Sequence, residues 1–224
     1  MKFTALASML SLTLLASHSS ADEYMELTRS DPHVPAHCQN VKVAQFSAAQ
    51  KFFVYGITGA VREGFQYEID LSRGEATQLW SALKGNLSAP EFLSQVRTDR
   101  RNLLANYFDF LTTEGEEMGF DYGKEGDLLE GLALRDLARE YPDSEYFRYG
   151  GVEYHEPGSA TMGELDLLVA RKSDCAVVAI GEAKLGTGQL SHAKSQLSRI
   201  FQFLRNKLCE RPSSATPVCT VRIR

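Results

Sequence analysis

The sequence predicts a mixed α/β (α+β) fold in which helices flank a sheet. Hydrophobic residues make up 43% of the 224 and charged residues 24%, a globular composition that excludes disordered and collagen-like classes. In the second half, a helical pattern precedes three strand-like segments, a long helical pattern and a final strand-like segment. The long helix can carry the chain across, so that the last strand joins the sheet of the other three.

The first half predicts strands and then helices. Residues 22–45 are polar and suggest an extended lead-in. Aromatic and β-branched residues in 51–71, interrupted by glycines, predict one or two strands. Apolar residues at helical spacing predict helices over residues 75–84 and 89–112.

A polar stretch over residues 113–119 is the best candidate for a domain boundary. It separates an N-terminal accessory region, residues 22–123, from a core of residues 124–224. The elements predicted in the core are a helix over 127–140, strands over 146–154, 164–170 and 175–184, a helix over 186–208 and a strand over 218–223.

The first 21 residues have the three regions of a secretory signal peptide. Lys2 precedes an apolar run of about 14 residues, and small residues at Ser19 and Ala21 predict cleavage after Ala21. A buried N-terminal helix is the alternative. The run is too short to span a bilayer, and no later stretch is apolar enough. We therefore expect a secreted or periplasmic protein without a membrane span.

Four cysteines are then expected in a compartment where disulfides persist. The preferred pairing joins Cys209 to Cys219 across a turn-like segment, which leaves Cys38 with Cys175. His33 and His37 lie near Cys38 and are the nearest match to a metal cluster, but a surface segment with one half-cystine is the simpler interpretation.

Charge is unevenly distributed along the chain. The whole chain has a net charge of −5, but residues 184–224 contain eight basic residues against Glu210 as their one acidic residue. Such a basic segment on an acidic body can bind phosphate. The alternative is a solvated helix face balanced by acidic neighbours.

Strand periodicity brings three charged side chains together. Glu182 and Lys184 are two residues apart and share one face of their strand, as do Glu164 and Asp166 on theirs. A three-residue turn between the strands would pair position 166 with 180 and 164 with 182. Asp166 would then lie diagonal to Glu182 on that face.

Two carboxylates this close raise each other's pKa unless a cation offsets them. Hard oxygen ligands suit Mg²⁺ or Mn²⁺, which could bind a substrate phosphate and help activate water. Lys184 could then stabilise charge on the phosphate. The alternative is a structural ion pair of Glu182 with Lys184 on a solvent face.

Gly163-Glu164-Leu165-Asp166, then fifteen residues, then Glu182-Ala183-Lys184 resembles the core motif of the PD-(D/E)XK nuclease superfamily. The resemblance covers about residues 124–224 and includes the order of predicted elements. Leu165 replaces the proline usually found before the aspartate. The resemblance implies a restriction-endonuclease-like core of helix, three strands, helix and strand, in which Asp166 and Glu182 hold the metal and Lys184 is catalytic.

The resemblance also implies roles for two helices. Glu130, on the helix before the strands, would be a third metal ligand, and Gln196, on the helix after them, would approach the substrate. Lys194 and Arg199 on that helix are expected to bind the substrate backbone. His192 is a further candidate for phosphate, with a solvated helical histidine as the alternative.

The sequence therefore predicts an exported metal-dependent nuclease that hydrolyses phosphodiester bonds, with DNA favoured as substrate. The second hypothesis is an inactive binding module of the same fold outside the cytoplasm, because one fold can serve both roles.

Overall fold

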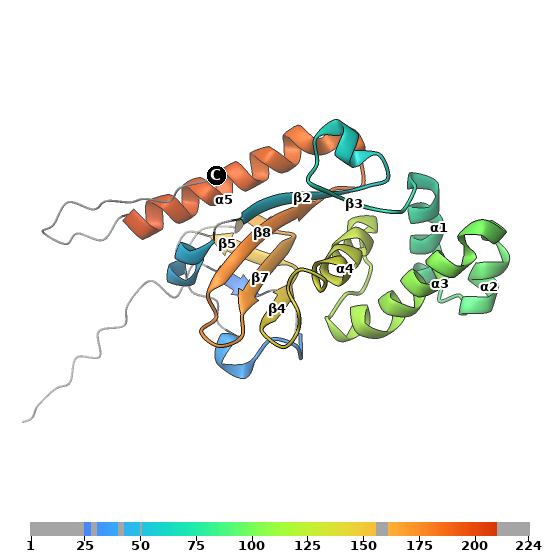
Figure 1. Ribbon diagram of the computed structural model, residues 1–224, viewed down its shortest axis with the longest axis horizontal. Helices are drawn as coiled ribbons and strands as arrows, with labels where there is room; N and C mark the ends of the chain where they lie inside the picture. The colour runs from blue at the N-terminus through green and yellow to red at the C-terminus, as the bar shows by residue number, and fades with distance from the viewer. Residues whose placement is uncertain (1–24, 28–30, 40–42, 50, 156–160, 210–224) are drawn as a thin grey trace, which may run out of the picture.

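The computed structural model describes residues 25–27, 31–39, 43–49, 51–155 and 161–209 (Figure 1). It is a mixed α/β structure with a curled five-stranded sheet and flanking helices. The strand order is β3-β2-β8-β7-β4, comprising β3 (Tyr67–Ile69), β2 (Lys51–Ile57), β8 (Val177–Ala183), β7 (Leu167–Arg171) and β4 (Tyr146–Tyr149). β2 is parallel to β3 and β8, whereas β7 is antiparallel to β8 and β4.

Helices cover both faces of this sheet (Figure 1). α4 (Glu125–Leu137) packs its leucines with Ala179 and Ala183 of β8 on one face. α5 (Leu190–Cys209) packs its apolar stripe with Ile180 on the other face. Both helices confirm the predicted ones, although α5 begins after a 3₁₀ turn at Thr187–Gln189. No helix of the described ranges is long and apolar enough to cross a bilayer.

The remaining helices form a group beside α4. α1 (Arg73–Lys84) begins at a capping box of Ser72 and Glu75, in which each side chain accepts from the other's backbone amide. The helix predicted over 89–112 is instead divided into α2 (Ala89–Ser94) and α3 (Arg101–Phe110), which continues as a π-helical turn. The separating segment contains Arg97, which has an extended backbone, and a short 3₁₀ turn at Thr98–Arg100. Periodicity alone did not reveal this break.

One long hairpin is shared between two sheets. The predicted strands 146–154 and 164–170 are each broken in two, giving β4 with β5 (Val152–His155) and β6 (Thr161–Leu165) with β7. The pairing register is continuous across the break, from Tyr149↔Leu168 to Val152↔Leu165. The outer half forms a second sheet of order β1-β5-β6 with β1 (Met25–Leu27). Gly151, with φ 72°, makes the bend on one strand.

The register of β7 with β8 differs from the predicted one by two residues. Leu168 pairs with Ile180, and the ladder shifts between Val169 and Ala170. The turn is longer than three residues because Cys175 adopts a left-handed backbone with φ 57° and its amide bonds to Arg171 O at 3.0 Å. A shift of two residues keeps every side chain on its face of the sheet. The side chains predicted to share a face therefore still do so.

The region set apart as accessory contributes strands to the main sheet. β2 pairs in parallel with β8 over five residues, from Lys51↔Ala179 to Tyr55↔Ala183. The boundary at residues 123 and 124 therefore does not separate two sheets. The predicted last strand 218–223 and the signal peptide 1–21 lie outside the described residues.

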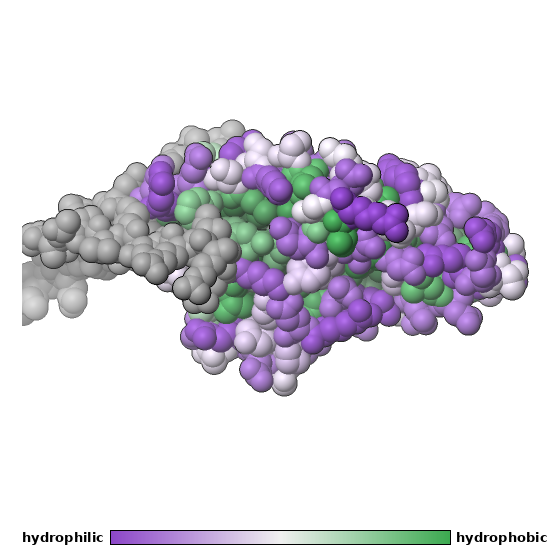
Figure 2. Space-filling model, turned by 45° about the horizontal axis from the view of Figure 1, so that its top comes forward, coloured by the Kyte–Doolittle hydropathy of each residue, from purple (hydrophilic) through white to green (hydrophobic). Residues whose placement is uncertain are grey.

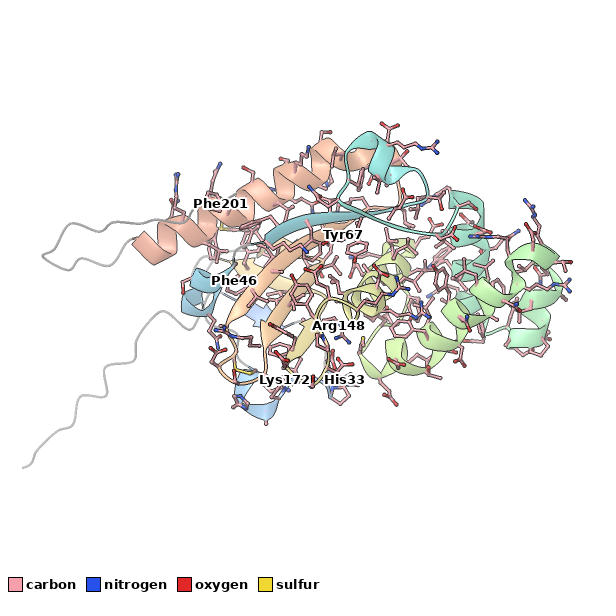
Figure 3. The ribbon with its side chains drawn as sticks, viewed as in Figure 1. His33, Phe46, Tyr67, Arg148, Lys172 and Phe201 are labelled. Atoms are coloured by element: carbon pink, nitrogen blue, oxygen red, sulfur yellow. A yellow bond between two sulfur atoms is a disulfide. The ribbon has the colours of Figure 1, made fainter. Side chains whose placement is uncertain are left out.

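A disulfide joins Cys38 to Cys175, as predicted, and ties the N-terminal segment to the β7–β8 turn. Nearby, the His37 ring bonds to Lys172 O at 2.8 Å. His37, Cys38 and Cys175 are close enough to resemble a metal site, but both sulfurs are used in the disulfide. Figure 3 shows Lys172 and His33 at this end of the molecule, away from α5. The proposed partner of Cys209, Cys219, lies outside the described residues.

The molecular surface in Figure 2 shows hydrophilic side chains over most of the described part, with smaller apolar groups between them. Among the described residues, Val61 and Met162 are the large apolar side chains that are exposed. The apolar stripes of α4 and α5 are instead used against the sheet.

We expect the Cys38–Cys175 disulfide to carry a large part of the folding stability. It closes a loop with a sequence separation of 137, and loss of such a cross-link costs about 2–5 kcal/mol. Cys38→Ala/Cys175→Ala should lower the free energy of unfolding by this amount in urea titrations. Reducing agent should lower the stability of the oxidised wild type by more than that of the double variant, which keeps Cys209 and Cys219. Equal stability of both oxidised proteins would contradict this role.

Candidate active site

Three charged side chains meet where the shared hairpin bends away from the main sheet. Asp166 lies in the bend between β6 and β7, and Glu182 and Lys184 lie at the end of β8. Lys184 Nζ donates to Asp166 Oδ2 at 2.6 Å and to Glu182 Oε2 at 2.7 Å. The predicted convergence of these three residues is confirmed by their hydrogen bonds.

The main chain holds this cluster from both sides. On one side of β8, the Lys184 amide donates to Tyr55 O of β2 at 3.0 Å. On the other side, the pairing of β8 with β7 ends because the chain before β7 bends away into the second sheet. The Ala183 amide there donates to Asp166 Oδ2 at 2.9 Å. The aspartate side chain thus replaces a missing backbone acceptor, which fixes its position.

Glu182 is buried, with 0% of its surface exposed. Burial, and then the charge of Asp166, raise the pKa of Glu182 to about 9 despite the opposing effect of Lys184. Burial alone would lower the pKa of Lys184, but the charges of Asp166 and Glu182 raise it above its usual value. The alternative of an ion pair on a solvent face does not fit, because the Glu182 side chain is 1% exposed and that of Lys184 is 12% exposed.

One oxygen of this cluster is unsatisfied. Glu182 Oε2 accepts from Lys184, whereas Oε1 is buried and has no hydrogen-bond partner among the described residues. A buried acceptor without a donor is costly. Asp166 and Glu182 offer hard carboxylate oxygens of the kind that Mg²⁺ or Mn²⁺ binds. The residues present therefore fit a divalent metal, which Asp166 and Glu182 would hold.

Glu130 approaches the sheet from the other side. It lies half-buried on α4, which packs on the face of β8 that carries Ala179 and Ala183. Successive side chains of a strand point to opposite faces, so Glu182 belongs to the α5 side together with Ile180. The hydrogen bonds described here join Asp166, Glu182 and Lys184, and the role of Glu130 as a third metal ligand stays a prediction.

The expected substrate-binding residues lie along α5. His192, Lys194 and Arg199 are exposed. Gln196 is half-buried, and its Oε1 is buried without a hydrogen-bond partner in the described part of the chain. The helix therefore presents cationic side chains to solvent and one unsatisfied amide oxygen to its packed side.

Tyr154 is a neighbour of the site that the sequence did not indicate. It is buried in β5. Burial raises the pKa of its hydroxyl, the charge of Arg199 lowers this pKa, and the charge of Glu182 raises it. Its hydroxyl occupies the space that Gly163 leaves, because a Cβ at Gly163 would lie 2.5 Å from it. The glycine before the motif was the one available signal, but the bent hairpin that brings Tyr154 here could not be seen in the sequence.

Comparison of the chain with protein families, curated proteins and solved structures finds no match.

The buried carboxyl of Glu182 should make stability depend on pH. In the unfolded chain this group ionises near 4.5, but in the folded protein it keeps its proton up to about pH 9. Unfolding between these values releases a proton, so the free energy of unfolding should fall with rising pH, by at most about 1.4 kcal/mol per pH unit.

Glu182→Gln should flatten this fall when unfolding is followed in urea with EDTA from about pH 5 to about pH 9. Glu63→Gln, which changes an exposed glutamate, is the matched control and should keep the wild-type slope. The same slope in Glu182→Gln as in the wild type would show that Glu182 is ionised in the folded protein.

Proposed function

We propose that the protein is an exported metal-dependent nuclease of the PD-(D/E)XK type. The observation that carries this proposal is the buried Glu182 with its unsatisfied Oε1, beside Asp166 and within reach of Lys184. Without a metal, the raised pKa of Glu182 keeps this carboxyl protonated near neutral pH, so a bound ion would displace that proton. A metal site needs such an oxygen, because the ion takes the place of a hydrogen-bond donor.

The arrangement of elements supports a restriction-endonuclease-like core. α4 precedes the bent hairpin and β8, and α5 follows β8. The aspartate of the motif stands where one strand begins, and the glutamate and lysine stand where the next one ends. The sheet position on the other side of β8 is occupied by β2, so the N-terminal region completes the sheet beside the site.

Phosphodiester hydrolysis forms a bond from a water oxygen to phosphorus and breaks the bond to the leaving oxygen, which takes up a proton as the water loses one. A bound Mg²⁺ would supply a Lewis acid for the phosphate and lower the pKa of a bound water. Asp166 is held by the Ala183 amide and can keep its place when a metal arrives. Lys184 can turn its ammonium from the carboxylates to the developing negative charge on the phosphate.

A nucleic-acid substrate is supported by the exposed cationic side chains of α5. Lys194, Arg199 and Arg205 are exposed on this helix, and cationic side chains on one helix are suited to a polyphosphate backbone. DNA remains the favoured substrate.

Export is supported by the Cys38–Cys175 disulfide, since such bonds persist in oxidising compartments. A secreted or periplasmic location after cleavage near Ala21 is part of the proposal. The competing proposal is a binding module that keeps the fold without catalysis. It would bind nucleic acid through α5 but would not need the cluster to be intact.

The decisive experiment is a cleavage assay with the oxidised protein starting at Asp22. Circular DNA, linear DNA and RNA are each incubated with Mg²⁺, Mn²⁺ or EDTA. We expect metal-dependent cutting that Asp166→Ala abolishes and Lys184→Ala slows by about 10²–10³-fold. Lys84→Ala, which removes an exposed lysine at the end of α1, should cut like the wild type. Binding without cutting under all conditions would favour the binding module.

Binding should also depend on salt through α5. Each phosphate contact adds about 0.9 to the slope of log affinity against log salt concentration. Lys194→Ala/Arg199→Ala should therefore reduce the slope by about 2, measured by fluorescence anisotropy in EDTA. The control, Lys84→Ala/Arg97→Ala, removes two exposed charges outside this helix. An unchanged slope in the α5 variant would show that the helix does not contact the backbone.

A further inference from the structure

Two buried oxygens that lack a hydrogen-bond partner lie on the same side of β8. They are Glu182 Oε1 and Gln196 Oε1. In the part of the chain that the structure describes, Arg148 Nε is the only other buried side-chain nitrogen or oxygen without a partner. Glu182 lies on the α5 side of the sheet with Ile180, and Gln196 belongs to α5 itself. Both oxygens therefore lie between one helix and one strand.

Helix α5 runs back along β8, in the direction opposite to the strand (Figure 1). Its first residue, Leu190, lies at the edge of the sheet where β2 and β8 end, because a Cβ at Gly64, beyond the end of β2, would lie 3.2 Å from Leu190 Cδ2. Farther along the helix, Phe201 packs on Phe52 near the start of β2, with ring centroids 6.0 Å apart. Successive turns of α5 therefore lie nearer to the start of β8.

These contacts place Gln196 at the level of Glu182. Phe52 pairs with Ile180, so Phe201 marks the level of Ile180 on the helix. Gln196 precedes Phe201 by five residues, or about 7.5 Å of helix. Glu182 follows Ile180 by two residues, or about 6.6 Å of strand. Because the helix and the strand run in opposite directions, the two displacements point the same way and nearly match.

Gln196 also lies on the side of α5 that faces the bent hairpin. Residues seven apart on a helix lie on nearly the same side, so Gln196 shares its side with Phe203. The Phe203 ring packs on Tyr154 of β5, in the second sheet, with centroids 5.1 Å apart. The Glu182 carboxyl is close enough for its charge to act on the Tyr154 hydroxyl. The carboxamide is therefore on the side of the helix where Glu182 meets Asp166.

Two acceptor oxygens at one place require a positive group between them. A proton shared by the two side chains can serve, and so can a divalent cation that replaces it. A carboxamide oxygen is a hard ligand of the kind that suits Mg²⁺ and Mn²⁺. Unlike a further carboxylate, it adds no negative charge beside Asp166 and Glu182. A glutamine can therefore supply a ligand here without adding like-charge repulsion to the metal-free protein.

We propose that the Gln196 carboxamide oxygen is a ligand of the divalent cation that Asp166 and Glu182 would hold. The inference rests on the proposed function and adds a ligand from α5 to its metal site. It differs from the sequence-based expectation, in which Gln196 approaches the substrate. The ion would then attach α5 to the sheet, so metal binding should stabilise the fold partly through this residue.

The first measurement is the affinity for Mn²⁺ without nucleic acid, followed by the electron paramagnetic resonance signal of the free ion. Gln196→Met keeps an unbranched side chain but replaces the oxygen by a thioether, which Mn²⁺ binds poorly. We expect this variant to bind Mn²⁺ about tenfold or more weakly than the wild type. Gln196→Glu keeps an oxygen and adds a charge, so it should bind Mn²⁺ at least as tightly as the wild type.

The matched control is Gln202→Met, because Gln202 is an exposed glutamine on the same helix. It should bind Mn²⁺ like the wild type. Asp166→Ala should abolish the binding, which assigns the measured ion to this cluster. Melting temperatures in EDTA establish that the variants are folded, and the rise on addition of Mn²⁺ should be smaller in Gln196→Met than in the wild type.

The outcomes separate this inference from the proposed function. Wild-type affinity for Mn²⁺ in Gln196→Met would overturn the inference and leave the nuclease function intact. A raised KM for nucleic acid in that variant would then assign Gln196 to the substrate. Binding of Mn²⁺ that survives Asp166→Ala would place the ion elsewhere and also overturn the inference. A wild-type protein that binds no Mn²⁺ would overturn the proposed metal-dependent nuclease together with this ligand.

Discussion

The bend of one hairpin between two sheets is the constraint on which the rest of the structure depends. Its register runs unbroken from Tyr146↔Arg171 through Val152↔Leu165, so the two sheets are halves of one ladder. At the bend, β8 loses its neighbour while it still has backbone groups to satisfy. Asp166 supplies the missing acceptor, and the same movement of the chain leaves room for Glu182 and Lys184 between the sheets and α5. The cluster is a consequence of how this ladder ends.

This location explains why a costly group persists in the interior. Burying a carboxyl that lacks a donor for one oxygen opposes folding, and the like charge of Asp166 adds to the cost. The ion pairs with Lys184 offset part of it, since all three groups approach within hydrogen-bond distance. An apolar residue at position 182 would pack against α5 without such conflict. Costly buried groups of this kind are most often found at functional sites, which is why the proposed function is based on this cluster.

Local periodicity was enough to predict much of the site. The pairing of strands that are distant in the sequence could not be predicted. A spacing of two residues put Glu182 and Lys184 on one face, and helical spacing correctly located α4 and α5. The register of β7 with β8 was wrong by two residues because it depends on the left-handed Cys175 and a shifted ladder, neither of which leaves a pattern. The pairing of β2 with β8 and the arrival of Tyr154 both depend on contacts between distant segments. Strand signals identify such segments but do not say which one pairs with which.

The parallel pairing of β2 with β8 also bears on when the chain can fold. β2 lies near the N-terminus and its partner near the end of the described chain, so the central strand of the sheet cannot be completed until almost all of the polypeptide is present. Sheets built from such distant segments form slowly, because a long loop must close, with a loss of entropy, before any stabilising contact forms. For a chain proposed to leave the cytoplasm, this delay has a use. If the chain is exported as proposed, it would stay unfolded while it crosses the membrane, and the sheet would form after the segment that contains β8 has followed.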